Sequence, residues 1–539
     1  MQVEHARFAS EQRLPRGFVL YALATILIST TWLWPHIVHF RHVPDRGDPI
    51  FSAWRLARFA HQLANDPWHL FDGNIFFPLP LTLTYSDATV LQGIVGAPLI
   101  WLGIEPLVVA NALFFFAFPL CGLAFFYTGW RLTGDARAGF ITGILGAWYP
   151  FHGEHYSHLE LQWFMFVPIA LLALPLVLAR PTLRRGLLLG AGVGAQWLAS
   201  MYLGVMLLTL LIPYGIAIAL AWRCRPSVPL LRSLSAAALV VLTCMTTALP
   251  YMASRASRGD RALSSLGAGS AFPSNYADTH RRMAAYPWRS RVANHPEREL
   301  HPGISTVLLA LGGIVIAPTA ITVALVCGAV AAFDWSLGVN GVTYQLLYEF
   351  VLPYRGIRVP ARFSVLLGSC LILLGGFGVS SVLRRLRPKT SNIAFAAVAI
   401  AVILDLRMTT VLVEYWSTVP AIYQDVRADM VLAEFPAGHA IDYMYFSTTH
   451  WARLVGGYSG YIPVDSELDS ASMFPSAAAL ASLRERGATH LTYNCAFERS
   501  PERCVHTLTQ LDSSALIDVV STARWNGTEV RLYKLVDVP

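Results

Sequence analysis

The chain has 539 residues; 55% of them are hydrophobic, 14% are charged, and the formal net charge is +7. A soluble domain has about a quarter of its residues charged, so this composition excludes a soluble globular enzyme, a disordered chain and a fibrous repeat. The apolar runs are continuous rather than alternating, which indicates a polytopic α-helical membrane protein and not a β-barrel. The excess of Lys and Arg is expected to record membrane topology, and no feature indicates binding to nucleic acid.

The first apolar run, residues 18–38, follows Arg7, Arg13 and Arg16 and lacks an evident small-residue cleavage site. It predicts an uncleaved signal-anchor helix whose basic flank stays in the cytoplasm. In total we expect about eleven full spans, each of roughly 20 residues. The later candidate spans are residues 106–130, 138–151, 161–180, 186–201, 203–222, 232–252, 303–317, 318–334, 362–382 and 392–411.

The apolar stretch 88–103 decides the predicted topology. If it is a half-helix or an interfacial helix, the short basic turns fall in the cytoplasm, as the positive-inside rule favours. These turns hold Arg131, Arg137, Arg180, Arg184, Arg185, Arg223, Arg225, Arg384, Arg385, Arg387 and Lys389. We therefore expect a multi-pass protein of the bacterial cytoplasmic (inner) membrane, with its N-terminus inside and its C-terminus outside. The Arg-rich segment 253–302 then lies outside, which the rule tolerates in longer loops.

Hydrophobicity falls from about Val413 onward, which predicts a transmembrane domain over 1–411 and a small extracytoplasmic α/β domain over 412–539. The elements expected in the second domain are strands at 440–446, 489–493 and 530–535 and a helix at 477–486 that stops at Gly487. Cys495 and Cys504 could form a disulfide if this domain faces an oxidising compartment, although spacing alone does not establish their geometry.

The first outside loop holds the most informative motif, Asp45-Arg46-Gly47-Asp48-Pro49, which precedes a helical stretch over 50–64. One face of this stretch carries Trp54 and small apolar residues, and another carries Arg55 and Arg58. That pattern is typical of a helix lying in the membrane interface. Asp48 suits the N-cap of this helix. The alternative is a catalytic or substrate-binding carboxylate, because ionisable groups at membrane depth are commonly functional.

The same loop continues with Asp72 before Gly73, and then with Tyr85-Ser86-Asp87. Aromatic residues interleaved with carboxylates suit carbohydrate stacking and hydrogen bonding, but they also suit an ordinary interfacial aromatic belt. Asp72 fits an Asx-turn. Asp87 either caps the next apolar helix or supplies a second functional carboxylate.

A second polar cluster lies between two predicted spans and contains His152, Glu154, His155, His158 and Glu160. His155 and His158 are close enough in a helix to bind one metal ion, but nothing fixes further ligands. Lining of a polar cavity is the alternative. A protonated histidine could also stabilise a phosphate.

A third cluster, Arg355, Arg358 and Arg362, lies just before a predicted span, and Pro360 fits the first turn of its helix. Helix N-termini bind anions, and arginine binds phosphate through two hydrogen bonds. Because these residues lie on the side that the charge rule disfavours, they indicate a phosphate site. Anchoring to lipid headgroups is the alternative.

These motifs together resemble bacterial membrane proteins of the GT-C glycosyltransferase superfamily. The resemblance covers nearly the whole chain. It rests on Gly47-Asp48-Pro49 with Trp54, Leu70-Phe71-Asp72-Gly73-Asn74-Ile75-Phe76-Phe77-Pro78, Tyr85-Ser86-Asp87, Arg358-Val359-Pro360-Ala361-Arg362-Phe363, Tyr445-Phe446-Ser447-Thr448 and Gly456-Gly457-Tyr458-Ser459-Gly460.

The resemblance implies a GT-C-like transmembrane domain that transfers a sugar from a polyprenyl-phosphate donor to an extracytoplasmic glycan, lipid or protein. It implies Asp48 as the base, with Asp87 or Asp45 as a second acidic residue, and inversion at the anomeric carbon is expected. Donor phosphate contacts are expected from Arg358, Arg362, Arg355, His155 and His158, and sugar or acceptor contacts from Asp45, Trp54, Asp72 and Tyr85. No residues are assigned to a metal and no cofactor is certain, although a divalent metal remains open.

No Gly-rich nucleotide-binding loop is visible, which agrees with a donor that is not a nucleotide. Two other functions fit the same composition. One is a transporter or flippase of lipid-linked saccharides, and the other is a non-catalytic membrane scaffold of cell-envelope assembly.

Overall fold

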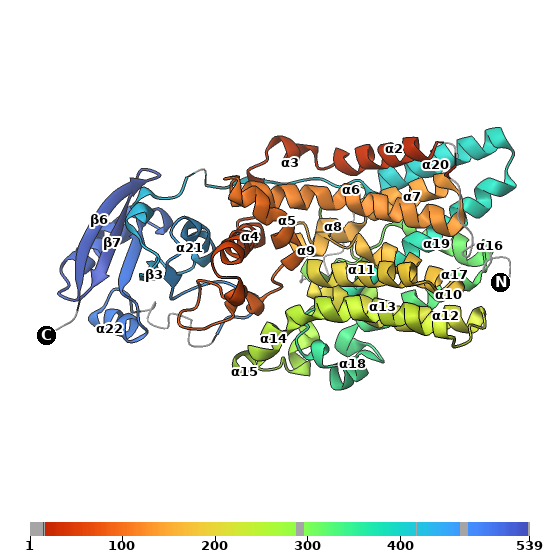
Figure 1. The fold of residues 1–539 in the computed structure, drawn as a ribbon. Coiled ribbons are helices and arrows are strands. Elements are labelled where there is room, and N and C mark those ends of the chain that lie inside the picture. The colour runs from red at the N-terminus through yellow and green to blue at the C-terminus, as the bar shows by residue number, and fades with distance from the viewer. Residues whose placement is uncertain (1–13, 16, 287–295, 417, 464–472, 537–539) are drawn as a thin grey trace. The chain divides into compact units, whose positions relative to one another are not determined.

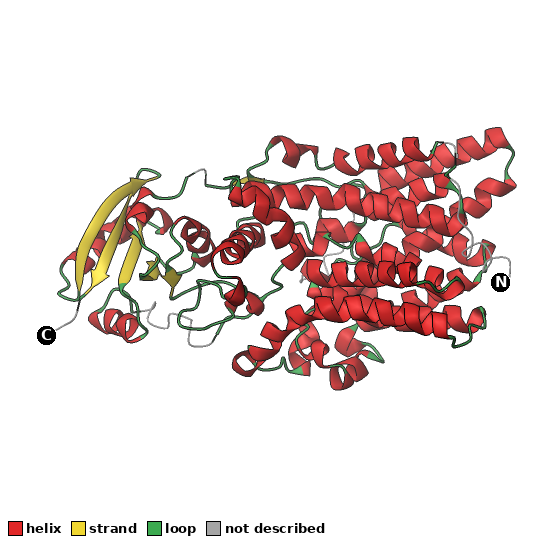
Figure 2. Cartoon of the chain, in the orientation of Figure 1, coloured by secondary structure: helices red, strands yellow, loops and turns green. Residues whose placement is uncertain are grey.

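The computed structural model describes the whole chain except residues 1–13, 16, 287–295, 417, 464–472 and 537–539 (Figure 1). The chain is mostly helical, and its strands are short and few (Figure 2). It divides into two compact units. Unit 1 comprises residues 1–40, 111–247 and 260–412, and unit 2 comprises residues 41–110, 248–259 and 413–539.

Unit 1 is built from apolar helices. Its principal helices are α2 (Phe18–Thr31), α3 (Trp34–Val38), most of α6 (Pro106–Thr133), α7 (Ala136–Ala147), α8 (Pro150–Glu154), α9 (Leu159–Gln162), α10 (Phe166–Ala179), α11 (Leu183–Ala199), α12 (Met201–Ala221), α13 (Val228–Met245), α16 (Ile304–Ile316), α17 (Ala320–Ser336), α18 (Tyr344–Phe350), α19 (Ser364–Arg385) and α20 (Pro388–Leu406). Two short 3-10 turns, η6 (Pro296–Arg298) and η9 (Pro360–Phe363), carry charged residues discussed below.

Six helical stretches within the described residues are long and apolar enough to cross a membrane, so the chain is a multi-pass membrane protein by length and composition. They are Pro106–Thr133, Leu159–Ala179, Met201–Ala221, Val228–Ala253, Pro360–Arg385 and Pro388–Leu406. Every other predicted span also contains a helix, but each of those helices is shorter than 18 residues. The count of eleven crossings and the orientation therefore stay predictions.

The ambiguous stretch 88–103 forms α5 (Val90–Trp101), a helix of 12 residues with Pro98 inside it. At 1.5 Å per residue such a helix is about 18 Å long, whereas a hydrocarbon core is about 30 Å thick. Its length agrees with the half-helix alternative on which the predicted topology depends.

Small residues let the helices of unit 1 approach closely. A Cβ added at Gly313 of α16 would lie 2.0 Å from the carbonyl oxygen of Leu374 in α19, and one at Gly186 of α11 would lie 2.0 Å from that of Ser233 in α13. Any side chain would push these pairs apart. Backbone approach at small residues is the usual way in which membrane helices gain contact area.

Unit 2 combines segments that are far apart in the sequence. Its elements are β1 (His42–Val43), α4 (Asp48–Asn65), α5, α14 (Leu249–Ala253), α15 (Arg255–Arg258), β2 (Val413–Glu414), β3 (Val431–Phe435), α21 (Ala440–Phe446), β4 (Arg453–Leu454), α22 (Ala477–Glu485), β5 (His490–Asn494), α23 (Pro501–Asp512), β6 (Ile517–Trp525) and β7 (Thr528–Leu535). Strand β1 pairs antiparallel with β2, and α21 packs on α4 (Figure 1).

The C-terminal part of unit 2 contains a mixed five-stranded sheet with the order β4-β3-β5-β7-β6 (Figure 2). Strand β3 pairs parallel with β4 and β5, and β7 pairs antiparallel with β5 and β6. The strands predicted at 489–493 and 530–535 are confirmed as β5 and β7. The helix predicted at 477–486 is confirmed as α22, which Ser476 caps and after which Gly487 adopts a φ of +88°.

The strand predicted at 440–446 is wrong, because these residues form helix α21. Its aromatic residues favour strands in general, but side-chain contacts decide here. Asp442 lies in the first turn, where a carboxylate is favoured by the helix dipole, and it accepts hydrogen bonds of 3.0 Å from Tyr415 and Trp416. The helix then buries Tyr443, Met444 and Phe446.

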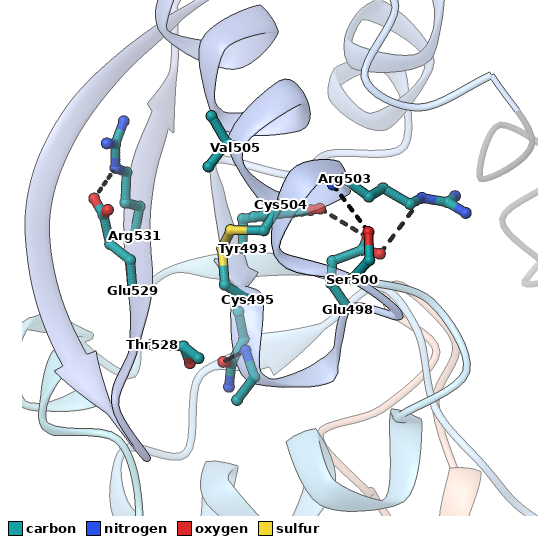
Figure 3. Close-up of a disulfide and its surroundings, with 12 residues drawn as sticks. Tyr493, Cys495, Glu498, Ser500, Arg503, Cys504, Val505, Thr528, Glu529 and Arg531 are labelled. Atoms are coloured by element: carbon teal, nitrogen blue, oxygen red, sulfur yellow. Dashed lines mark hydrogen bonds and ion pairs between the residues drawn. A yellow bond between two sulfur atoms is a disulfide. The ribbon is translucent and has the colours of Figure 1, made fainter.

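Cys495 and Cys504 form a disulfide, with their Cα atoms 5.4 Å apart (Figure 3). The bond joins the 3-10 turn η14 (Cys495–Phe497), directly after β5, to the first turns of α23. The helix is capped by Ser500, which accepts a hydrogen bond of 3.3 Å from the backbone N–H of Arg503 (Figure 3). The side chains of both cysteines lie in the sheet's apolar core.

A buried carboxyl makes the stability of this sheet depend on pH. Burial raises the pKa of Glu434, on β3, to about 8, although its hydrogen bond of 2.7 Å from Tyr423 favours the ionised form. Since the folded-state pKa is the higher one, stability is greatest below about pH 4.5 and falls as the pH rises toward 8. The expected slope approaches 1.4 kcal/mol per pH unit across that window.

Hydrogen exchange of the β3 and β5 amides in the detergent-solubilised full chain, corrected for intrinsic exchange rates, measures this slope. We expect Glu434→Gln to flatten it, because the amide cannot ionise, while Glu485→Gln at the end of α22 leaves it unchanged. Equal pH dependence in the wild type and in Glu434→Gln would show that Glu434 is not the responsible group.

Candidate active site

The N-terminus of α4 presents Asp48 in a position different from the predicted cap. The helix begins at Asp48, with Pro49 in its first turn, and Gly47 occupies the N-cap position without a side-chain cap. The side chain that folds back on this turn is that of Asp45, whose Oδ1 accepts a hydrogen bond of 2.8 Å from the N–H of Gly47. The N-cap prediction for Asp48 is therefore wrong. Its carboxylate instead lies at the positive end of the helix dipole.

Asp48 is half-buried, whereas Asp45 is exposed. The hydroxyl of Tyr458 donates a hydrogen bond of 3.3 Å to Oδ1 of Asp48. Tyr458 comes from the loop that follows β4, more than 400 residues further along the chain. A partly desolvated carboxylate with a fixed hydrogen-bond donor is suited to accept a proton from a substrate hydroxyl.

The polar face of α4 is buried, which differs from the exposed face expected of an interfacial helix. Arg55 is 2% exposed and Arg58 is 9% exposed. Arg55 donates to the carbonyl of Asp87 at 2.5 Å, Arg58 to that of Asp72 at 3.0 Å, and Gln62 to that of His69 at 2.7 Å. These side chains satisfy backbone carbonyls of the loop that follows the helix, so the polar face organises this loop.

Trp54 and Tyr85, predicted as sugar contacts, are core residues in this structure. Trp54 is 1% exposed, and its indole N–H donates a hydrogen bond of 3.2 Å to Asn74. Tyr85 is 3% exposed, and its ring lies edge-on to that of Tyr461 at 5.4 Å. Asp72 is half-buried, and its Oδ1 accepts a hydrogen bond of 2.7 Å from the N–H of Leu81, which closes the loop between them.

Asp87 lies close to α4 because Arg55 binds its carbonyl, about two turns along the helix from Asp48. Helix α5 begins at Val90 with Thr89 at its N-cap position and has no side-chain cap. A hydrogen bond of 3.4 Å from the N–H of Thr89 to Oδ1 of Asp87 stabilises the turn before it. Asp48 and Asp87 thus both belong to the environment of α4 in unit 2.

One cation in unit 2 was not singled out from the sequence. Arg258, at the end of α15, lies 5.9 Å from the ring centroids of Tyr85 and Tyr251. Its Nε donates to Ser254 and its Nη2 to the carbonyl of Tyr251. Its Nη1 has no partner among the residues that the structure describes, and burial lowers the pKa of this guanidinium. A partly buried arginine that binds only neutral groups can accept an anion.

The histidine cluster lies in unit 1, where the residue after α8, the turn η6 and the turn η9 meet. His155 lies 3.7 Å from Glu297 and 3.9 Å from Glu154. Glu297 also forms a bidentate ion pair with Arg362, with N–O distances of 3.1 and 2.5 Å. In this structure Arg362, a predicted phosphate ligand, is therefore engaged by Glu297. The side chains of all four residues are 10% exposed or less.

Burial sets the charges of this cluster. It raises the pKa of Glu154 well above its ordinary value, and the nearby Glu297 and Glu299 add to that effect. Burial also lowers the pKa of His155 well below its ordinary value. For Glu297 burial opposes ionisation, but Arg362 and His155 outweigh it and hold the pKa below its ordinary value. The cluster thus contains one ion pair, a neutral histidine and a protonated carboxyl.

The other histidines serve different contacts. His158 lies at the N-cap of α9, with its ring centroid 5.6 Å from that of His155. His152 is buried, 2.7 Å from Gln162, and stacks on Phe118. Among the described residues no group of three or more His, Cys, Asp or Glu side chains converges in a way that could hold a metal ion. The structure offers no ligand set for the divalent metal that the sequence left open.

The remaining two arginines of the third cluster differ in their surroundings. Arg355 lies 3.7 Å from Asp260 and donates a hydrogen bond of 3.1 Å to the carbonyl of Glu349. Arg358 is exposed, two residues before η9, and makes no hydrogen bond or ion pair within the described part of the chain. Of the three arginines predicted to bind phosphate, Arg358 is the one whose guanidinium has all its donors available.

The structure thus brings the predicted site residues together in two groups. Unit 2 holds the carboxylates and aromatics of the first loop, namely Asp45, Asp48, Trp54, Asp72, Tyr85 and Asp87. Unit 1 holds the predicted phosphate ligands, namely His155, His158, Arg355, Arg358 and Arg362.

No family model matches the chain, and no curated protein matches it. Three solved structures are similar to it. One is the Archaeoglobus fulgidus oligosaccharyltransferase in complex with Zn and sulfate, at 12% identity and a TM-score of 0.44, covering 88% of this chain and 68% of that one. Two are ArnT from Cupriavidus metallidurans, in the apo state and bound to undecaprenyl phosphate, both at 14% identity and covering 96% of this chain and 97% of that one, with TM-scores of 0.41 and 0.36.

Both similar proteins are GT-C glycosyltransferases, the superfamily that the sequence motifs resemble. With TM-scores below 0.5, these similarities by themselves assign no donor, acceptor or catalytic residue to this chain.

Proposed function

We propose that this chain is a membrane glycosyltransferase that takes a sugar from a polyprenyl-phosphate donor and transfers it to an acceptor outside the bacterial cytoplasmic membrane. The observation that carries the proposal is Asp48: a half-buried carboxylate at the start of α4, hydrogen-bonded by Tyr458, in the first long connection between apolar helices. The multi-pass helical architecture and the family resemblance of the sequence support it.

The proposed step is a single in-line displacement at the anomeric carbon. Asp48 accepts the proton of an acceptor hydroxyl, and the hydroxyl oxygen forms a bond to the anomeric carbon. The bond from that carbon to the phosphate oxygen breaks, and its electron pair leaves with the polyprenyl phosphate. The configuration of the sugar is inverted, and the step balances without any further reactant.

The departing phosphate gains charge and therefore needs a cation. Arg358 is the best candidate in unit 1, because it is exposed at the start of an apolar span and has no protein partner among the described residues. Arginine can bind phosphate through two parallel hydrogen bonds. In unit 2, Arg258 has an unused Nη1 and is a second candidate.

Arg358→Ala is expected to fold normally and to raise the KM for the lipid-linked donor by about 10- to 100-fold, the effect of losing one charge-assisted interaction. Arg358→Lys should fall between the two, because lysine keeps the charge but not the bidentate geometry. Steady-state transfer by purified protein measures this. Arg387→Ala, beyond the other end of α19, is the matched control, and an unchanged KM in Arg358→Ala would contradict the assignment.

The outer location of the C-terminal part is supported by the Cys495–Cys504 disulfide, because such bonds persist mainly in oxidising compartments. The acceptor then lies outside as well.

Mass spectrometry of glycolipids, wall glycans and glycoproteins from cells with and without the gene tests the proposal as a whole. We expect one glycan class to lose a single sugar residue. Loss of complete saccharides from the outer surface, with their lipid-linked forms retained inside, would instead indicate a flippase.

A further inference from the structure

The loop after β4 holds a tyrosine against the proposed catalytic carboxylate. Besides the hydroxyl contact of Tyr458 to Asp48, its ring lies edge-on to that of Phe51, one turn along α4, with a centroid distance of 5.4 Å. The backbone N–H of Tyr458 donates to the sulfur of Met444 in α21 at 3.2 Å. The side chain is thus fixed at its ring and at its backbone.

The neighbours of Tyr458 dock this loop onto the first loop. The carbonyl of Gly456 accepts a hydrogen bond of 3.2 Å from the N–H of Phe76. A Cβ added at Gly457 would lie 2.9 Å from the Cβ of Ile75 and 3.0 Å from the ring of Phe76. Three residues after Tyr458, the ring of Tyr461 packs against that of Tyr85. The Gly-Gly pair therefore lets this loop lie against the first loop, with Tyr458 at the start of α4.

We infer that Tyr458 is a positioning residue for Asp48, and that the C-terminal part of the chain completes the active site by supplying it. The inference rests on the proposed function for its catalytic meaning. A hydroxyl that donates to a carboxylate favours the charged form and fixes which oxygen faces the substrate. It gives the C-terminal part a role beyond anchoring or recruitment, because the carboxylate is not held correctly without it.

The test measures the protonation of Asp48 without relying on transfer. Carbodiimide labelling of the detergent-solubilised full chain at a series of pH values, read by peptide mass spectrometry, gives the titration midpoint of Asp48. We expect Tyr458→Phe to raise this midpoint by roughly half to one pH unit, since a donor to the charged form is lost. The acid limb of the pH profile of transfer should move by the same amount.

Two further variants keep the test sharp. Tyr461→Phe makes the same change in the same loop and should leave the Asp48 midpoint unchanged. Gly457→Ala should displace the loop and raise the midpoint as Tyr458→Phe does. An Asp48 midpoint that is equal in the wild type, Tyr458→Phe and Gly457→Ala would overturn the inference.

Failure of the proposed function looks different from failure of the inference. If the midpoint shifts but Asp48→Asn transfers sugar at the wild-type rate, Tyr458 does hold Asp48, yet Asp48 is not the base.

Discussion

Asp48→Asn and Asp48→Ala are expected to lower the rate of sugar transfer by about 10²- to 10⁴-fold, the usual contribution of a general base. Donor binding should change little, because the carboxylate acts on the acceptor hydroxyl and not on the lipid phosphate. Single-turnover transfer in detergent or nanodiscs measures the rate, and equilibrium binding of a fluorescent polyprenyl phosphate measures donor affinity.

The matched control is Asp66→Asn, directly after the other end of the same helix, where the side chain is 47% exposed and pairs with His69. It should transfer at the wild-type rate. If the Asp48 variants also keep that rate, the base must be sought elsewhere, and Asp87 is the next carboxylate to change. If no transfer is found in any form, while translocation of a lipid-linked saccharide is measurable and unaffected, a flippase describes the chain better.

The second large effect is expected on stability, from the buried Glu297–Arg362 pair. Arg362→Met leaves Glu297 without its bidentate partner, and removal of one member of a buried pair costs about 3–5 kcal/mol. We expect a large fall in the thermal unfolding temperature of the detergent-solubilised protein. The double variant Glu297→Gln with Arg362→Met should recover much of the loss, because neither buried charge then remains.

Arg355→Gln is the comparison for this prediction. Its pair with Asp260 is longer, at 3.7 Å, and the two side chains are 38% and 31% exposed, so its loss should cost no more than about 1 kcal/mol. Equal destabilisation by Arg362→Met and Arg355→Gln would mean that the Glu297–Arg362 pair is not buried in the folded protein.

The sequence predicted the parts of the fold that depend on local patterns. Long apolar runs located every helix of the membrane region, since a helix hydrophobic on all sides needs no tertiary information to be recognised. The edges β5 and β7 of the C-terminal sheet followed from alternation and turn residues. Residues 440–446 could not be predicted, because their helix depends on packing against α4 and on donors to Asp442 from Tyr415 and Trp416.

The candidate site was predictable as residue types but not as partners. Asp48 and Arg358 stood out as charges in unusual places, whereas nothing near Arg362 indicated that Glu297, 65 residues away, would occupy it. Tyr458 was visible only as part of a Gly-rich motif. Its contact with Asp48 spans 410 residues, and no local pattern encodes such a separation.

The Cys495–Cys504 bridge has a consequence for how this protein matures. In the proposed topology the thiols can be joined only after the chain has been translocated, because cytosolic reductants keep thiols reduced. Closing so short a ring, with a sequence separation of 9, restricts the unfolded chain by roughly 2–3 kcal/mol. The last lobe, which carries the loop that reaches Asp48, would thus gain its full stability only after export, and newly made enzyme inside the cell would be left incompletely assembled.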